Sequence, residues 1–262
     1  SSYDYESLKD ITLHKTEIKV EVGIDPAYTQ KGLKQLTLSN DFGPLDASKP
    51  FMPFGAQPKR DASFVVGNKE IFSKKDAAVR VNIEWANVPV DPSDLDADNE
   101  DDYSPQTKLE FLAGGIWSNQ KVDETESSTF ELFDVVSDET QARKIVDVPA
   151  DHIRSTVYAD YAEAYNNYNA ASKSGFMRFV LMDDFKHKKY MDDLVLYLID
   201  KANGHDPDAP KEPYTPLVKS IYLSYSASVI TTHNSASEAD FLNRQVQYFH
   251  IYPFGEAEMH AY

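Results

Sequence analysis

Cysteine is absent from the 262 residues of this chain, and this absence excludes disulfide bonds, thiolate catalysis and cysteine-ligated zinc. Long apolar runs are missing too. No stretch approaches the roughly 20 apolar residues that a helix needs to cross a bilayer, so we expect no membrane span. The N-terminal residues Ser1–Glu6 lack signal-peptide character. Their abrupt polar start is typical of a fragment of a longer chain.

Positive charge is scarce. The chain has 26 Lys and Arg residues against 43 Asp and Glu residues, which gives a formal net charge of −17. Such a surface repels a phosphate backbone, so we expect no nucleic-acid partner. Basic patches on partner proteins remain compatible with it.

The common catalytic motifs are also missing. The sequence contains no Gly-rich phosphate loop, no Gly-x-Ser-x-Gly elbow and no His-Glu-x-x-His helix. Its seven histidines include no pair at metal-ligand spacing. We therefore predict that the chain is not an enzyme, with no catalytic residues and no cofactor. Abundant carboxylates leave a glycosidase open as a lesser alternative.

One acidic run is the best candidate for a metal site. Residues 91–102 hold seven acids and no base, and Asp94, Asp96 and Asp98 match the first three ligands of a calcium loop. The pattern then departs from that loop, because Asn99 stands where the glycine belongs and Pro105 where the bidentate glutamate belongs. We favour a solvated loop, with weak calcium binding as the alternative.

What the chain does have is aromatic residues, 12% of the total, and apolar residues that alternate with polar ones. Residues 79–85 show the clearest alternation, which predicts a half-buried antiparallel strand. A tight hairpin is expected at Gly67-Asn68 between residues 63–66 and 70–72. Further strands are expected at residues 18–22, 36–38, 109–112, 130–136, 176–182, 218–230 and 246–252.

A different period marks residues 187–203. Apolar residues recur there at helical spacing (Met191, Leu194, Val195, Leu198, Ile199 and Ala202), which predicts an amphipathic helix packed on a sheet. A second helix is expected around residues 158–171. We therefore predict a mainly β, antiparallel, sandwich-like fold with one clear helix packed on it. The chain is taken as a single module over residues 1–262, with two β units divided near residue 150 as the alternative.

Two kinds of residue attract attention as structural or binding groups. The triplet Pro-Phe-Gly occurs at Pro53, Phe54 and Gly55 and again at Pro253, Phe254 and Gly255. We expect it to form stiff turns, because Pro fixes φ, Phe anchors the loop and Gly permits positive φ. Trp117 can stack on a sugar ring, so a carbohydrate-binding or adhesive β-sandwich is the alternative function.

Four blocks of sequence, in order, resemble the J-like baseplate wedge proteins of extracellular contractile injection systems, which are relatives of phage tails. The blocks are residues 41–58 continuing to 85, residues 175–179, residues 212–228 and residues 249–255. Their order and spacing agree with the family over about residues 33–256, which is most of the chain. The Tyr-rich segment that the family commonly has soon after its Glu-Trp strand is displaced here by the acidic run.

The resemblance implies a structural, non-catalytic component of a baseplate. Its expected partners are other baseplate proteins, hub or spike proteins and sheath-initiating proteins. Its expected location is a tail-like particle that is assembled in the bacterial cytoplasm and can be released from the cell. No catalytic residue is carried over by this resemblance.

Overall fold

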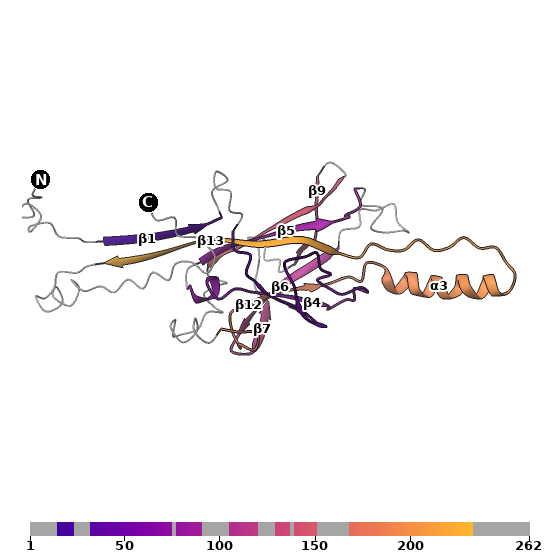
Figure 1. Cartoon of the computed structure of the whole chain (residues 1–262), viewed down its shortest axis with the longest axis horizontal. Coiled ribbons are helices and arrows are strands. Elements are labelled where there is room, and N and C mark those ends of the chain that lie inside the picture. The colour runs from indigo at the N-terminus through magenta and orange to yellow at the C-terminus, as the bar shows by residue number, and fades with distance from the viewer. Residues whose placement is uncertain are drawn as a thin grey trace, which may run out of the picture.

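The computed structural model describes residues 15–23, 32–74, 77–90, 105–119, 129–136, 139–150 and 168–232. These residues form two antiparallel sheets packed together, with one α-helix beside them (Figure 1). The predicted fold class, a mainly β sandwich-like domain with one helix, is confirmed.

The smaller sheet has the strand order β1-β13-β5-β11. Its strands are β1 (Lys15–Val22), β13 (Leu217–Thr232), β5 (Ala77–Ala86) and β11 (Arg143–Val148). β13 is the longest strand, with 16 residues, and it pairs with β5 on one side and β1 on the other.

The larger sheet has the order β3-β2-β4-β12-β6-β7, and β8 also pairs with β6. Its strands are β2 (Thr37–Asn40), β3 (Gly43–Leu45), β4 (Ser63–Gly67), β6 (Gln106–Ala113), β7 (Ile116–Asn119), β8 (Thr129–Glu131) and β12 (Phe176–Leu181). β9 (Asp134–Val136) and β10 (Glu139–Gln141) form a separate ribbon. Both main sheets combine strands from before and after residue 150.

The core lies between the two sheets and follows from the alternation in β5. Val79, Val81, Ile83 and Trp85 are each at most 2% exposed, so all four face the interior as predicted. Phe64 on β4 stacks on Phe179 of β12 at 5.9 Å between ring centroids. The buried residues of both sheets form one continuous cluster, which is the main source of stability for a sandwich.

The predicted hairpin at Gly67-Asn68 is wrong. Residues Ile71–Ser73 form a 3₁₀ turn, η2, and not a returning strand. The reason is local: Asn68 Oδ1 accepts hydrogen bonds from the backbone N–H of Glu70 at 2.9 Å and of Ile71 at 3.1 Å, which starts a helical turn. Gly67 serves close packing, because a Cβ there would collide with the Phe176 ring.

Most of the other expected strands are present within one to three residues of their predicted bounds. The expected strand at 130–136 is interrupted at Leu132 and Phe133, where both side chains turn into the core, and so it becomes β8 and β9. The strand expected at 246–252 lies outside the described residues, as does most of the helix expected at 158–171.

The helix α3 (His187–Ala202) forms where the apolar period predicts it, but it is not packed on either sheet. It projects beyond the ends of the strands and the chain returns alongside it (Figure 1). Of its 16 residues only His187 is buried. The predicted packing is therefore wrong, since a period identifies an apolar face without identifying what covers it. No helix among the described residues is long and apolar enough to cross a membrane.

Candidate interaction surface

The most distinctive surface feature is the arm, which we define as residues 187–216. It consists of α3 and a return segment, residues 203–216, that leads into β13. At about 1.5 Å per residue the 16-residue helix is about 24 Å long. An extended return from residue 205 to residue 214, at about 3.1 Å per residue, spans about 28 Å. The two halves of the arm therefore match in length.

The arm begins at a turn with unfavourable backbone geometry. Phe185 and Lys186 have φ values of 51° and 59°, a region that disfavours residues with a side chain. Two carboxylates hold the turn: Asp183 Oδ1 accepts a hydrogen bond from the N–H of Phe185 and Asp184 Oδ1 accepts one from the N–H of Lys186. Burial of the Phe185 ring, which is 0% exposed, offsets the backbone cost.

An aromatic cluster fixes both ends of the arm to the body. Phe133, Phe185 and Tyr214 contact one another edge to face, with ring centroids 5.9–6.2 Å apart. Trp85 joins the cluster at 5.1 Å from Phe133. Tyr214 also donates a hydrogen bond to the carbonyl oxygen of Ala86 at 2.9 Å, and burial raises its pKa to about 12. The outgoing and returning chains are thus held at one point in the core.

His187 links the two halves of the arm at its base. Its Nε2 lies 3.3 Å from the carbonyl oxygen of Tyr214 and 3.2 Å from the hydroxyl of Thr215. Burial lowers the pKa of His187 below its ordinary value of 6.5. A neutral imidazole therefore makes this contact at neutral pH.

The return segment places its prolines at a period of three. Residues 207, 210, 213 and 216 are Pro, and all four are at least half-buried, whereas residues 208, 209, 211 and 212 are exposed. A polyproline helix has three residues per turn, so the prolines share one face. On α3 the half-buried residues are Tyr190, Asp193, Leu194 and Tyr197, which lie on one side of the helix.

At the tip the helix ends on a backbone hydrogen bond from His205 N–H to the carbonyl oxygen of Asp200, at 3.1 Å. Gly204 has a φ of 83°, which permits the reversal of the chain. The helix and the return segment are therefore joined by the turn at the tip and by side-chain contacts at the base.

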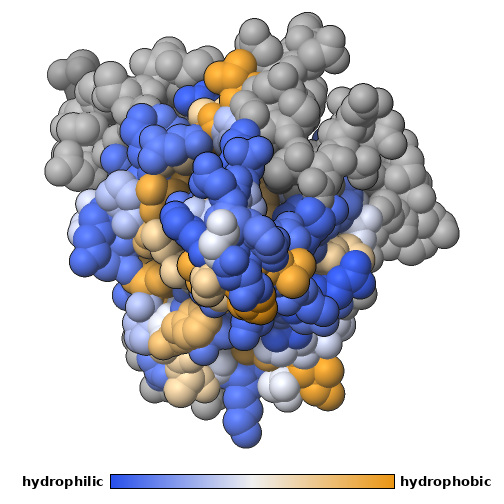
Figure 2. Space-filling view, turned by 90° about the vertical axis from the view of Figure 1, so that its right-hand side faces the viewer, coloured by the Kyte–Doolittle hydropathy of each residue, from blue (hydrophilic) through white to orange (hydrophobic). Residues whose placement is uncertain are grey.

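The face of α3 that points away from the return segment is apolar and exposed. We call Met191, Val195, Leu198, Ile199 and Ala202 the apolar stripe. Met191, Val195, Leu198 and Ile199 are 43, 53, 54 and 51% exposed. Seen from the arm end, separate hydrophobic patches lie among hydrophilic surface (Figure 2). Apolar side chains gathered on one exposed face are typical of a protein contact.

A second exposed feature surrounds the first Pro-Phe-Gly turn. Pro53 and Phe54 are buried, and Gly55 has a φ of 81°. A Cβ at Gly55 would collide with the ring of Phe42, which lies at the β2–β3 turn and is 77% exposed. Asn40 Nδ2 donates a hydrogen bond to the carbonyl oxygen of Met52 at 3.2 Å. The two loops, residues 40–43 and 51–55, therefore form one surface.

The remaining sequence candidates are not brought together. Asp94, Asp96 and Asp98 lie outside the described residues, as do Pro253, Phe254 and Gly255. Across the part of the chain that the structure describes, no three His, Asp or Glu side chains cluster as metal ligands would. A shallow depression of about 320 Å³ is lined by Glu84, Gln141, Ala142 and Arg143. Its one carboxylate, Glu84, already contacts Lys219 at 2.7 Å.

One face of the Trp117 indole is covered by Arg178. The guanidinium of Arg178 lies 4.4 Å from the ring centroid, in a cation–π contact. Arg178 is held there by Glu110 Oε2, which accepts a hydrogen bond from Arg178 Nε at 2.7 Å. Sugar stacking at Trp117 would have to use the opposite face.

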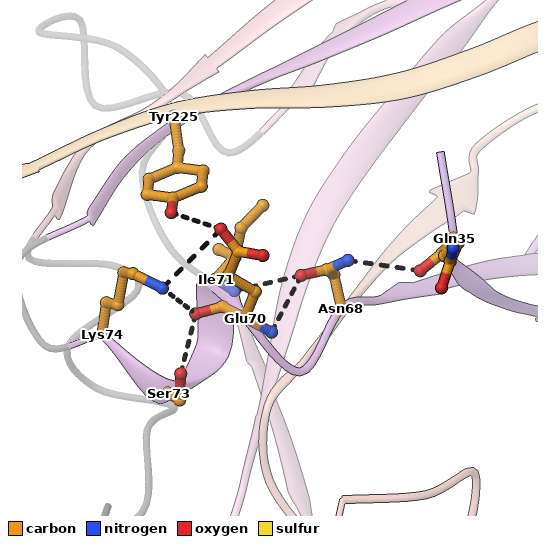
Figure 3. A network of polar contacts seen from close by, with 7 residues as sticks. All are labelled: Gln35, Asn68, Glu70, Ile71, Ser73, Lys74 and Tyr225. Atoms are coloured by element: carbon orange, nitrogen blue, oxygen red, sulfur yellow. Dashed lines mark hydrogen bonds and ion pairs between the residues drawn. The ribbon is translucent and has the colours of Figure 1, made fainter. Parts of the chain in front are cut away.

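A buried polar network lies between the sheets and was not foreseen from the sequence (Figure 3). Tyr225 of β13 donates a hydrogen bond to Glu70 Oε1 at 2.5 Å, and Lys74 Nζ donates one to the carbonyl oxygen of Glu70 at 2.9 Å. Burial lowers the pKa of Lys74 to about 8. Ser73 and Asn68 bond to the backbone of the same turn. These contacts bind η2 to the opposite sheet, and only the isolated Asn68 next to Gly67 hints at them in the sequence.

Comparisons with known proteins identify no relative. No protein-family model matches this chain, and no curated protein matches it. The resemblance drawn from the sequence blocks therefore stays a prediction.

Proposed function

We propose that this chain is a structural, non-catalytic component of the baseplate of a contractile, phage-tail-like injection particle, and that its arm contacts a neighbouring protein in the assembly. The observation that carries this proposal is the apolar stripe, which stands clear of the two-sheet body on an arm anchored at its base. A rigid projection with an exposed apolar face serves binding and has no evident use in catalysis.

The anchoring of the arm supports this role. A free 16-residue helix is marginal in water, because nucleation is costly and few residues share the cost. Here the Phe133–Phe185–Tyr214 cluster and the His187 contacts fix both ends of the arm. A binding surface that is ordered before it meets its partner loses less conformational entropy on association.

Two of the four resemblance blocks contain surface features of the described structure. The block at residues 41–58 includes the adjoining loops 40–43 and 51–55, and the block at residues 212–228 includes the end of the arm and most of β13. Both blocks contain exposed loop residues next to buried anchors, as an assembly module requires.

The test is to locate the chain. A tagged copy, expressed in a bacterium that carries the gene, should co-purify with sheathed tail-like particles and label their baseplate end in electron micrographs. Deletion of the gene should leave tubes and sheath subunits that do not assemble into complete particles. A tagged chain absent from purified particles, together with normal particles from the deletion strain, would contradict the proposal.

A further inference from the structure

The apolar stripe has the spacing of a helix-pairing seam. Met191, Val195, Leu198 and Ala202 are separated by four, three and four residues, which is the spacing of the a and d positions of a heptad repeat. Ile199 broadens the seam on one side. All five residues are in the exposed face of α3. A straight seam of this kind packs along one partner helix, at a crossing angle of about 20°.

The return segment leaves the seam open. The half-buried residues Tyr190, Asp193, Leu194 and Tyr197 line the flank of α3 along which the return segment runs. The stripe lies outside this flank, and its a and d rows are the width of one partner helix.

The stripe is complementary to itself when two copies run in opposite directions. In the register that centres between residues 196 and 197, Met191 lies opposite Ala202 of the second copy, and Val195 lies opposite Leu198. Four apolar layers then stack, and the longest side chain faces the shortest. Large residues opposite small ones fill a helix interface without voids.

The charges of the arm favour the same arrangement. The base of α3 carries Lys188 and Lys189, whereas at or near the tip Asp200, Asp206 and Asp208 outnumber Lys201. Antiparallel pairing sets the base of each arm level with the tip of the other, so these opposite charges approach. Between Lys188 and Lys201 the helix carries three Lys and three Asp residues, so α3 itself has no net charge within a chain of net charge −17.

The charge of the bodies also favours one direction of pairing. Parallel arms would bring the bodies of two chains, each chain with a net charge of −17, together beside the arm bases. Antiparallel arms put the bodies at opposite ends of a helix about 24 Å long, and charge is screened over about 8 Å at physiological ionic strength.

We infer that α3 pairs with α3 of a second copy of this chain, antiparallel, with Val195 opposite Leu198 at the centre. The inference rests on the proposed function in that the arm is taken to be a protein contact, and it names the partner. Because the seam is short, the interface falls below the roughly 1,200 Å² of standard complexes, and the dimer is weak until assembly raises its local concentration.

The first experiment is sedimentation equilibrium of the purified chain up to about 500 µM, which reaches weak dimers. The native chain should show a concentration-dependent dimer. Leu198→Asp should lower the association constant at least about tenfold, because a charge enters the central layer. Leu196→Asp is the matched control: Leu196 is 60% exposed and points about 160° away from Leu198 around the same helix, and this variant should dimerise like the native chain. Equal loss in both variants would overturn the inference.

The second experiment tests the direction of pairing and uses the absence of native cysteine. A mixture of Met191→Cys and Ala202→Cys chains, treated with a short bismaleimide, should give mainly the mixed cross-linked dimer. Two Met191→Cys chains place their thiols about 16 Å apart along an antiparallel pair, and so should react slowly. Rapid Met191–Met191 cross-linking would indicate parallel arms and would contradict the inference.

The two proposals fail separately. A native chain that stays monomeric at every concentration, but whose tagged form is found in baseplates, overturns self-pairing and leaves the assembly function standing. A chain that dimerises as described but is absent from particles supports the pairing and overturns the baseplate assignment.

Discussion

Tyr225 and Glu70 show how single side chains hold the two sheets of this protein together. Their hydroxyl and carboxylate are buried and lie 2.5 Å apart, and they come from β13 and from the η2 turn beneath the other sheet. A buried hydrogen bond to a charged group contributes more than a neutral one, because neither group can turn to water.

Tyr225→Phe should lower the free energy of unfolding by about 1–3 kcal/mol, since it removes the hydroxyl donor to Glu70. Urea denaturation followed by fluorescence measures this change. Tyr222→Phe in the same strand is the control, because Tyr222 is only half-buried and should change stability by less than about 0.5 kcal/mol. Equal effects in both variants would contradict a special role for the Tyr225–Glu70 contact.

Phe54→Ala should cost about 3–5 kcal/mol of stability, the usual cost of truncating a buried Phe. The loss should impair folding or particle assembly, and thermal denaturation checks it. Phe42→Ala, at a ring that is 77% exposed beside the same turn, should have a much smaller effect. Normal stability in Phe54→Ala would show that this turn does not depend on its aromatic anchor.

His187 makes the base of the arm sensitive to pH. Burial lowers its pKa, and the carbonyl of Tyr214 and the charges of Asp184 and Glu212 oppose that shift without cancelling it. The folded state therefore binds the proton less readily than the unfolded state. Its contribution to stability is complete above the unfolded pKa of about 6.5 and is lost as the pH falls through the folded pKa.

Thermal melts should accordingly show a larger loss of stability between about pH 7.5 and about pH 5 in the native chain than in His187→Gln. The difference between the two profiles isolates His187 from the carboxylates that titrate in both proteins. Parallel profiles would rule out His187 as the titrating group at the base of the arm.

At the scale of elements, local pattern predicts local structure and little more. The alternation in residues 79–85 identifies both β5 and its buried face, because a pleated strand has only two faces. The period in residues 187–203 identifies α3 but not its surroundings, and the expected packing on a sheet is wrong. Asn68 converts the expected hairpin into η2 through two side-chain hydrogen bonds, a competition that apolar spacing cannot reveal.

In the arm, too, the sequence predicts the local elements and not their packing. The four prolines of residues 207–216 and the apolar residues of α3 are both visible in the sequence. Their pairing into an arm is not, because it depends on the Phe133–Phe185–Tyr214 cluster, whose members are far apart in the chain. Tertiary contacts of this kind leave no periodic signal.

Phe185→Ala should release the arm, since the buried ring anchors the turn before α3. Hydrogen exchange should accelerate in residues 187–202, while the amides of β5 and β12 stay protected, because a short helix without its anchor frays. Phe54→Ala is the comparison for a core loss of similar size. Acceleration spread evenly over both sheets in Phe185→Ala would contradict a local anchor.

At the scale of the molecule, two packed sheets carry an arm with an exposed apolar seam. The chain as a whole has a net charge of −17. The net negative charge discourages indiscriminate association, because copies of the chain repel one another. The seam is a place where a neighbouring helix gains apolar contact along its length. Assembly through the arm is consistent with both features.

The most direct test of this account is particle assembly in a strain whose gene is replaced by Leu198→Asp or by Leu196→Asp. The two variants change the same residue type, by the same charge, on opposite faces of one exposed helix. We predict that Leu196→Asp gives a normal number of complete sheathed particles in electron micrographs, whereas Leu198→Asp gives few or none. Equal numbers of complete particles from both strains would contradict the claim that the arm holds the assembly together.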